Sequence, residues 1–342
     1  MARSGGGDNR QVRYVRRPVG RLEESSFAVE DAPMPSPAEG EVLLRTLFLS
    51  IDPYMRRQML GVKGYAVPLR EGDVMQGRGI AEVVESRHPA HRPGDVVFGE
   101  IGWRLYAALP GGALRPVDRS VRPLSLHLGL LGAPGLTAWV GLTDYGHPRR
   151  GETVVVSAAA GAVGSLVGQI AKLRGCRAIG IAGGAEKCAH VVRDLGFDAC
   201  LDHRAGDLQE ALRRAAPEGV QVYFDNVGGA VLDAVLPNLA MGARIALCGM
   251  IAHYSATGPI AFRHLQSLLD NCVTLTGFRI GFVPPERRAA AAAELLDWFR
   301  AGKLRWRETV SDGLETAPAA LVGLFEGANT GKRIVRVAPG EG

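Results

Sequence analysis

The chain has 342 residues, of which 46% are hydrophobic and 22% are charged, and its formal net charge at pH 7 is +5. This length allows two domains of ordinary size, each with its own core. No segment approaches the roughly 18 unbroken apolar residues of a membrane-spanning helix, and the N-terminus lacks the apolar core of a secretory signal. We therefore expect a cytoplasmic protein without a membrane partner.

The positive charge is concentrated near the N-terminus, where Arg13, Arg16 and Arg17 lie close together. These arginines have no interleaved aromatic pairs and match no nucleic-acid-binding motif, so a solvated strand explains them better. We expect no nucleic-acid partner, and a mildly basic protein is suited to acidic small molecules.

Residues 10 to 125 show short β-type runs that are separated by turn residues. The runs are EVLLRTLFLS, GIAEVVES and DVVFGE, with Pro and Gly clusters at PMPSPAEGE and HRPGD. This pattern predicts a barrel-like β domain. GKRIVRV, near the C-terminus, is also strand-like and is expected to rejoin this first domain.

Residues 150 to 300 instead alternate apolar strands with helices. The expected strands are TVVVSA, RAIGIAG, ACLDH, VQVYFDN, ARIALCG and VTLTGF. Near-continuous apolar strands are buried on both faces of a sheet, so this half predicts a parallel, doubly wound α/β sheet.

A glycine-rich turn follows the first of these strands. Ala159, Gly161 and Gly164 occupy the three positions of G-x-G-x-x-G, between a strand and a helix. Gly161 allows the backbone to approach a pyrophosphate, and Gly164 allows close packing of helix and strand. Because the motif lies inside a series of βα units, we expect a dinucleotide site rather than a turn that serves packing alone.

The end of the second strand indicates which dinucleotide is bound. NAD enzymes place a carboxylate there on the ribose hydroxyls, whereas this strand ends on Gly183 and Gly184. Lys187 lies one turn further on, within reach of a 2′-phosphate, and Glu186 is expected to cap the helix or face water. This arrangement favours NADPH, although Lys187 is also consistent with an ordinary exposed lysine.

Several motifs together resemble a known family. SAAAGAVGSLVGQIAKLRGC, AGGAEKC, LGFDACLDHR, YFDNVGG, CGMIAHY, DPYMR, GAPGLTAW and GANTGKRIV occur in order between about residue 10 and residue 337. They resemble the zinc-independent medium-chain dehydrogenase/reductases, in the branch of leukotriene 12-hydroxydehydrogenase/prostaglandin reductase, plant alkenal double-bond reductases and curcumin reductase. The resemblance implies a GroES-like domain formed by residues 1–125 and 302–342, with a Rossmann domain at 126–301.

The resemblance also implies hydride transfer from NADPH to the β-carbon of a conjugated enone or enal. It further implies a homodimer that pairs the strands near VTLTGF. Two positions depart from the family pattern: His203 stands where a tyrosine is usual, and Gly184 replaces a serine. A partial positive charge on His203 would compensate near the 2′-phosphate, although an exposed loop histidine is an equally good interpretation. The implied nucleotide contacts are Gly161, Ala162, Val163, Gly164, Lys187, His203, Asn226, Cys248, Gly249, Tyr254, Phe278, Arg279, Ile280 and Asn329.

A catalytic zinc site is not expected. No cysteine precedes Cys176, the five cysteines form no C-x-x-C pair, and the eight histidines are scattered. By comparison with zinc-dependent relatives, the ligand positions hold Leu49, Arg78 and Ala133.

Hydride addition to an enone leaves an enolate oxygen, and a hydrogen-bond donor directed at that oxygen lowers the barrier. The resemblance indicates Tyr254 as a catalytic residue beside the nicotinamide ribose, whose 2′-hydroxyl is an alternative donor. Tyr54 is a second candidate, or else it only packs the domain interface. A phenol stays protonated at neutral pH and can donate, and solvent can supply the α-carbon proton.

Two other functions remain open at this point. Quinone reduction would use the same fold and hydride donor. A protein with vestigial catalysis would instead bind NADPH as a redox sensor or a structural dimer, which the presence of both tyrosines disfavours.

Overall fold

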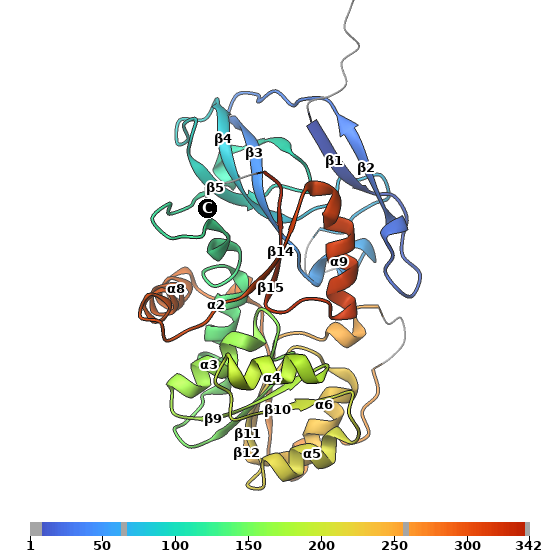
Figure 1. The fold of residues 1–342 in the computed structure, drawn as a ribbon, viewed down its shortest axis with the longest axis vertical. Coiled ribbons are helices and arrows are strands. Elements are labelled where there is room, and N and C mark those ends of the chain that lie inside the picture. The colour runs from blue at the N-terminus through green and yellow to red at the C-terminus, as the bar shows by residue number, and fades with distance from the viewer. Residues whose placement is uncertain (1–8, 63–66, 256–259, 339–342) are drawn as a thin grey trace, which may run out of the picture. The chain divides into compact units, whose positions relative to one another are not determined.

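The computed structural model describes residues 9–62, 67–255 and 260–338. The chain divides into two compact units (Figure 1). Unit 1 contains residues 1–128, 309–329 and 333–342, and unit 2 contains residues 129–308 and 330–332. Unit 1 is therefore assembled from both ends of the chain.

Unit 1 is built around an antiparallel sheet whose central strand is β3. Among the described residues this sheet has seven strands in the order β14-β15-β3-β4-β5-β7, with β6 also paired to β3. Val335 of β15 lies opposite Leu49 of β3, so the C-terminal strand pairs with the central strand of this sheet. The elements are β1 (Asn9–Tyr14), β2 (Phe27–Ala32), β3 (Glu41–Ser50), α1 (Tyr54–Met59), β4 (Arg78–Ser86), β5 (Val96–Glu100), β6 (Tyr106–Pro110), β7 (Arg115–Pro116), β14 (Glu308–Asp312), α9 (Ala317–Glu326) and β15 (Lys332–Arg336).

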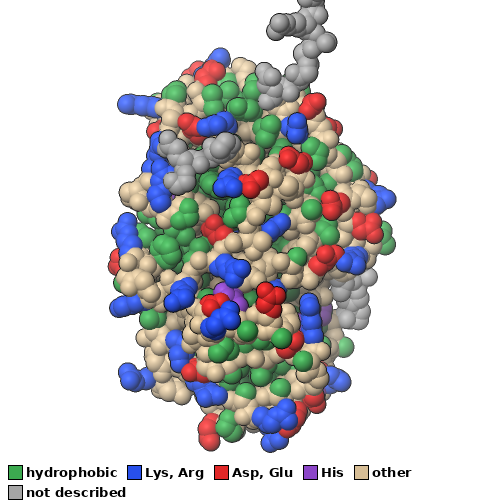
Figure 2. Space-filling view, viewed as in Figure 1, with side chains coloured by type: hydrophobic (Ala, Val, Ile, Leu, Met, Phe, Trp, Pro, Cys, Tyr) green, Lys and Arg blue, Asp and Glu red, His purple; other side chains and the backbone are tan. Residues whose placement is uncertain are grey.

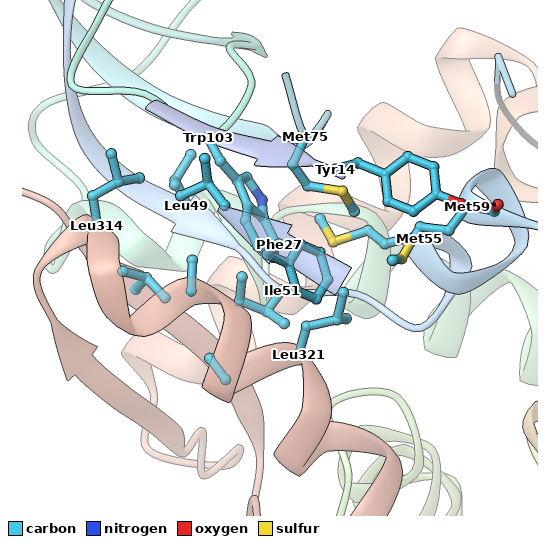
Figure 3. Close-up of a cluster of buried hydrophobic side chains, with 14 of the residues drawn as sticks. Tyr14, Phe27, Leu49, Ile51, Met55, Met59, Met75, Trp103, Leu314 and Leu321 are labelled. Atoms are coloured by element: carbon cyan, nitrogen blue, oxygen red, sulfur yellow. Dashed lines mark hydrogen bonds between the residues drawn. The ribbon is translucent and has the colours of Figure 1, made fainter. Parts of the chain in front are cut away.

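An apolar cluster holds α1 in place (Figure 3). The rings of Phe27 and Trp103 stack with their centroids 5.7 Å apart. The buried Tyr14 hydroxyl donates a hydrogen bond of 2.8 Å to the backbone oxygen of Met59, at the last residue of α1. Because buried hydroxyls need a partner, this bond fixes the end of the helix that begins at Tyr54.

Unit 2 contains a sheet that is parallel throughout its described strands, in the order β10-β9-β8-β11-β12-β13. All five residues of β8 are buried, and α3 and α4 pack against β8, β9 and β10. This confirms the predicted doubly wound sheet. The elements are α2 (Ala133–Val140), β8 (Thr153–Ser157), α3 (Gly164–Leu173), β9 (Arg177–Ala182), α4 (Ala185–Arg193), β10 (Ala199–Asp202), α5 (Leu208–Ala215), β11 (Val220–Asp225), α6 (Gly229–Val235), β12 (Leu239–Leu247), α7 (Ser267–Asp270), β13 (Thr274–Gly277) and α8 (Pro285–Arg300).

The surface carries charges of both signs. Figure 2 shows Lys and Arg side chains interspersed with Asp and Glu on the face in view. Arg13, one of the N-terminal arginines, lies in β1 and forms an ion pair with Glu30 of β2. Within the described part of the chain, no helix is long and apolar enough to cross a bilayer.

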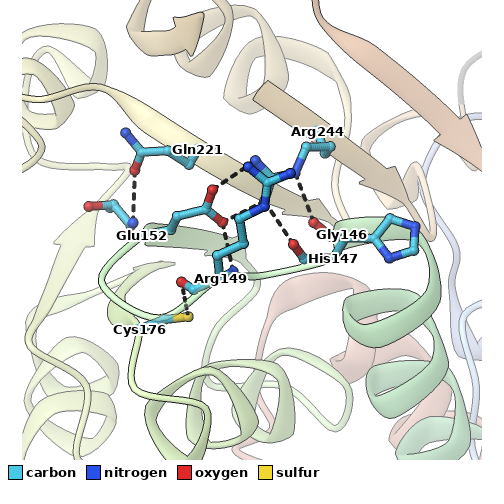
Figure 4. A network of polar contacts seen from close by, with 8 residues as sticks. Gly146, His147, Arg149, Glu152, Cys176, Gln221 and Arg244 are labelled. Atoms are coloured by element: carbon cyan, nitrogen blue, oxygen red, sulfur yellow. Dashed lines mark hydrogen bonds and ion pairs between the residues drawn. The ribbon is translucent and has the colours of Figure 1, made fainter. Parts of the chain in front are cut away.

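An ion pair ties β12 to the start of β8 (Figure 4). The Arg244 guanidinium contacts both carboxylate oxygens of Glu152 and donates to the backbone oxygens of Gly146 and His147. Only 16% and 15% of the two side chains are exposed. Burial alone would raise the pKa of Glu152, but hydrogen bonds from Arg244 and from the Arg149 N–H outweigh burial and lower it.

Replacing Arg244 by methionine should leave the largely buried Glu152 carboxylate without its ion-pair partner. We expect Arg244→Met to lower the free energy of unfolding by about 3 kcal/mol at pH 7. Since the pKa of Glu152 is lowered in the folded state, the stabilisation is complete above the unfolded carboxyl pKa and is lost as pH falls through the folded value. Urea unfolding should therefore show a smaller difference in the free energy of unfolding between the wild type and Arg244→Met at pH 3.5 than at pH 7. Arg213→Met, which removes an exposed pair with Glu210, should leave the free energy of unfolding unchanged at either pH, because solvent screens such pairs.

Candidate functional site

The carboxyl ends of the parallel strands place most of the predicted cofactor residues at one edge of unit 2. The glycine turn follows β8, Lys187 follows β9 and Asn226 follows β11. Cys248, Gly249 and Tyr254 follow β12, His203 follows β10, and Phe278, Arg279 and Ile280 follow β13. In open α/β sheets, ligands bind outside this edge.

The turn between β8 and α3 has no room for side chains at its glycines. A Cβ on Gly164 would lie 2.3 Å from the backbone oxygen of Ala158, and one on Gly161 would lie 3.1 Å from the same atom. Ala158 itself has a φ of 51°, in the left-handed region that alanine rarely adopts. Ala162 and Val163 complete the turn before α3. The N–H groups of Gly161 and Ser165 donate to the backbone oxygens of Ala158 and Gly161. The N–H groups between them, at the start of the helix, are of the kind that bind phosphate.

A buried carboxylate organises the turn that contains Asn226. Asp225 Oδ1 accepts hydrogen bonds from the Ser157 and Tyr223 hydroxyls, both 2.9 Å long, and from the N–H groups of Val227 and Gly228. The side-chain amide of Asn226 donates to the backbone oxygen of Ser157 at 2.8 Å. Burial is the main cause of the raised pKa of Asp225.

The segment after β12 is folded back over this turn. The N–H groups of Cys248 and Gly249 both donate to the backbone oxygen of Asp225, at 2.8 and 3.1 Å. The Tyr254 hydroxyl lies 3.4 Å from the position that a Cβ on Gly249 would take. Burial raises the pKa of Cys248 to about 12, so this thiol is not an activated nucleophile.

The segment after β13 contributes a packed ring and two further residues. Phe278 stacks on Tyr145 at 4.8 Å and meets Phe224 edge-on at 6.1 Å. The Arg279 guanidinium lies 5.0 Å from the ring centre of Phe282. The Phe278 ring is therefore part of the packing of unit 2, and it places the backbone of Ile280 beyond the end of β13.

Positive side chains gather at the ends of β9 and β10. A Cβ on Gly183 would lie 2.9 Å from both Arg204 Nε and His203 Nε2. The pKa of Lys187 is lowered, first by burial and then by the charge of Arg204. The pKa of His203, an exposed residue, is also lowered, first by desolvation and then by the Arg204 charge. This ring is therefore mostly neutral at pH 7 in the free protein, and its role toward the 2′-phosphate stays a prediction.

Two of the predicted site residues, Tyr54 and Asn329, lie outside unit 2. Tyr54 begins α1, and the Arg78 guanidinium lies 5.5 Å from the centre of its ring. Arg78 Nε also donates to Glu100 at 2.9 Å. Asn329 follows α9 in unit 1. Their roles toward the cofactor or substrate stay predictions.

Sequence reasoning missed three polar residues at the edge of unit 2. Ser157 and Asp225 form hydrogen bonds that hold the Asn226 turn. Arg204 lies near Lys187 and His203, and these three residues are called the basic group beside Gly183. Asp225 could have been found from the sequence, because it is a carboxylate at the end of a mostly apolar buried strand. Arg204 could not have been found from the sequence, because its position near Gly183 depends on the pairing of β10 with β9.

Comparisons with known proteins agree with this architecture. A family described as the N-terminal domain of oxidoreductase matches residues 10–117, and one described as zinc-binding dehydrogenase matches residues 162–298. The chain is 45% identical to the NADPH-dependent curcumin reductase of Escherichia coli, over 96% of this chain and 97% of the relative. It is 38% identical to the NADP(+)-dependent 2-alkenal reductase of Nicotiana tabacum, over 96% and 98%. The crystal structure of CurA from Vibrio vulnificus in complex with NADPH superposes with a TM-score of 0.92 at 43% identity, covering 97% of this chain and 100% of CurA.

These findings define an oxidoreductase with an N-terminal β domain and a parallel nucleotide-binding-type sheet. The chain belongs to the medium-chain dehydrogenase/reductase family, in the branch that contains the curcumin, prostaglandin and alkenal reductases. The predicted family is thereby confirmed.

A zinc ion does not fit the donor set of the described residues. No group of three or more His, Cys, Asp or Glu side chains that could hold a metal occurs within residues 9–62, 67–255 and 260–338. Leu49 is fully buried, Arg78 is a cation, and Ala133 has no donor atom. Zinc independence stays a prediction, and no step below uses a metal.

Proposed function

We propose that this protein is an NADPH-dependent reductase of carbon–carbon double bonds conjugated to a ketone or aldehyde. The observation that carries the proposal is the single sheet edge that gathers the glycine turn, the Asn226 turn, Tyr254 and the basic group beside Gly183. The names of the curcumin and 2-alkenal reductases, to which the chain is similar along almost its whole length, supply the substrate class.

The residues of unit 2 fit NADPH. The N–H groups of the Gly161–Gly164 turn bind the pyrophosphate, and the basic group that includes Lys187 and His203 binds the 2′-phosphate. The proposed contacts of the nicotinamide half are Asn226, Cys248, Gly249 and the segment from Phe278 to Ile280, and Asn329 remains a further proposed cofactor contact. NADPH, when bound, supplies the hydride for the β-carbon of the substrate.

Tyr254 stabilises the charge that develops on the substrate oxygen. Its hydroxyl lies over Gly249, at the carboxyl end of β12 and close to the Asn226 turn. A protonated phenol in this position donates a hydrogen bond to the enolate oxygen. Tyr54 is the second proposed donor, and solvent protonates the α-carbon.

Turnover with a panel of acceptors tests this function. We expect NADPH oxidation with a medium-chain 2-alkenal and an aromatic enone, a saturated carbonyl product, and no effect of a chelator. A saturated aldehyde should not react. Turnover of a quinone alone would replace this function by quinone reduction, and NADPH binding without any turnover would indicate a sensor.

We also propose a homodimer formed through β13. This strand is at the edge of the sheet, and Leu275 in it and Leu269 before it are 40% and 73% exposed. An exposed apolar edge strand is a template for pairing with a second copy. Sedimentation equilibrium should therefore give twice the chain mass, and Leu275→Lys should shift it to the monomer.

A further inference from the structure

Two residues of the basic group beside Gly183, Arg204 and His203, differ in how their charge depends on pH. Arg204 is charged at every physiological pH, whereas His203 titrates near neutrality. Both side chains approach Gly183 at the end of β9, because Asp202 pairs with Ala182 and the next two residues turn back over the strand.

The positive charges in this group repel one another. Burial and then the Arg204 charge lower the pKa of Lys187. Desolvation is also the largest cause of the lowered pKa of His203, and the charges of Arg204 and, least of all, Lys187 add to it. The nearby carboxylate, Asp202, accepts hydrogen bonds from the N–H groups of Gly184 and Arg204, at 2.9 and 3.0 Å. The Asp202 charge alone would raise the pKa of His203, yet the pKa of His203 remains lowered. A bound dianion would relieve this repulsion.

We propose that Arg204 determines the preference of this protein for NADPH over NADH, and that His203 takes up a proton when the 2′-phosphate binds between them. The inference rests on the proposed NADPH function and extends it to two named residues. Arg204 supplies a fixed charge and a forked donor, which match a phosphate. His203 is mostly neutral in the free protein and becomes a second cation beside the dianion.

The proton linkage has a definite sign. A phosphate dianion raises the pKa of His203 in the complex, so the complex holds one more proton than the separate partners. NADPH should bind more tightly as pH falls from 8.5 to 7, by at most about 10-fold for each pH unit, because one proton is linked to binding. The 2′-phosphate remains mostly a dianion in this range, because its second pKa is about 6. NADH has no 2′-phosphate, so its affinity should not change with pH through this group.

Isothermal titration calorimetry of the full-length protein with NADPH and NADH tests both parts. Titrations at pH 7.5 in HEPES and in Tris, both with chloride, report the protons taken up, since the two buffers differ in ionisation enthalpy. We expect uptake approaching one proton per NADPH in the wild type and none in His203→Gln. Arg204→Gln should raise the Kd for NADPH by about 10- to 100-fold and leave the Kd for NADH unchanged.

The matched control is Arg213→Gln, which removes an exposed arginine of α5 that pairs with Glu210. It should leave both affinities and the proton uptake unchanged. Equal proton uptake in the wild type and His203→Gln, or an unchanged ratio of NADPH to NADH affinity in Arg204→Gln, would overturn the inference. A protein that binds neither nucleotide would instead overturn the proposed function.

Discussion

Gly164→Ala is expected to abolish useful NADPH binding. The new Cβ would lie 2.3 Å from the backbone oxygen of Ala158, 2.9 Å from its carbonyl carbon and 3.0 Å from Ala159 Cα. These are backbone atoms, so the turn itself must move. We expect the Kd for NADPH to rise at least about 100-fold, which corresponds to the loss of two charge-assisted hydrogen bonds. Overpacking of this kind also costs about 1–3 kcal/mol of stability.

Fluorescence titration with NADPH and thermal unfolding measure the two effects. Gly112→Ala is the matched control, because nothing lies within 4 Å of a Cβ at that position and its φ is not in the left-handed region. It should match the wild type in both measurements. If Gly164→Ala bound NADPH within threefold of the wild type, the proposed role of the turn would be wrong.

Tyr254→Phe is expected to lower kcat for a 2-alkenal by about 100- to 1000-fold, the effect of losing one donor to a developing oxyanion. The phenyl ring can keep its place over Gly249, so the Kd for NADPH should change less than threefold. Steady-state kinetics with a fixed saturating NADPH concentration would measure kcat and KM separately.

Tyr106→Phe removes a hydroxyl from β6 in unit 1 and serves as the control for this series. Its kinetics should equal those of the wild type. A Tyr254→Phe enzyme with full kcat would leave the nicotinamide ribose 2′-hydroxyl or Tyr54 as the donor, and Tyr54→Phe would then distinguish them.

The elements that could be predicted from the sequence are those whose residue pattern lies within one short segment of the chain. VVVS of β8 is buried on every residue, and its apolar run predicts a central parallel strand. The spacing of Gly161 and Gly164 after that strand predicts a tight turn, and the structure shows the contacts of Ala158 that require it. The strand-like pattern of GKRIVRV predicted that this segment rejoins the first domain, but only the structure shows that its partner is β3.

The parts that could not be predicted depend on which strands become neighbours. Arg204 approaches Gly183 because β10 lies beside β9, and no periodicity within either strand reports that pairing. The lowered pKa of His203 follows first from desolvation and then from the charge of Arg204, both of which depend on the folded arrangement. The hydrogen bonds of Asp225 likewise come from β8, β11 and the following turn together.

The pairing of β15 with β3 also affects how the chain can fold during synthesis. Unit 2 is encoded almost continuously and can begin to form once α8 has left the ribosome. β3 is made early, but β15, which pairs with its residues 48–50, is translated only after unit 2. Residues 41–45 of β3 can pair with β6 as soon as β6 is made, whereas the edge at residues 48–50 stays unpaired until β15 is translated, and such an edge is a site for misassembly. Truncations that remove residues 332–336 should consequently aggregate rather than yield a smaller folded protein.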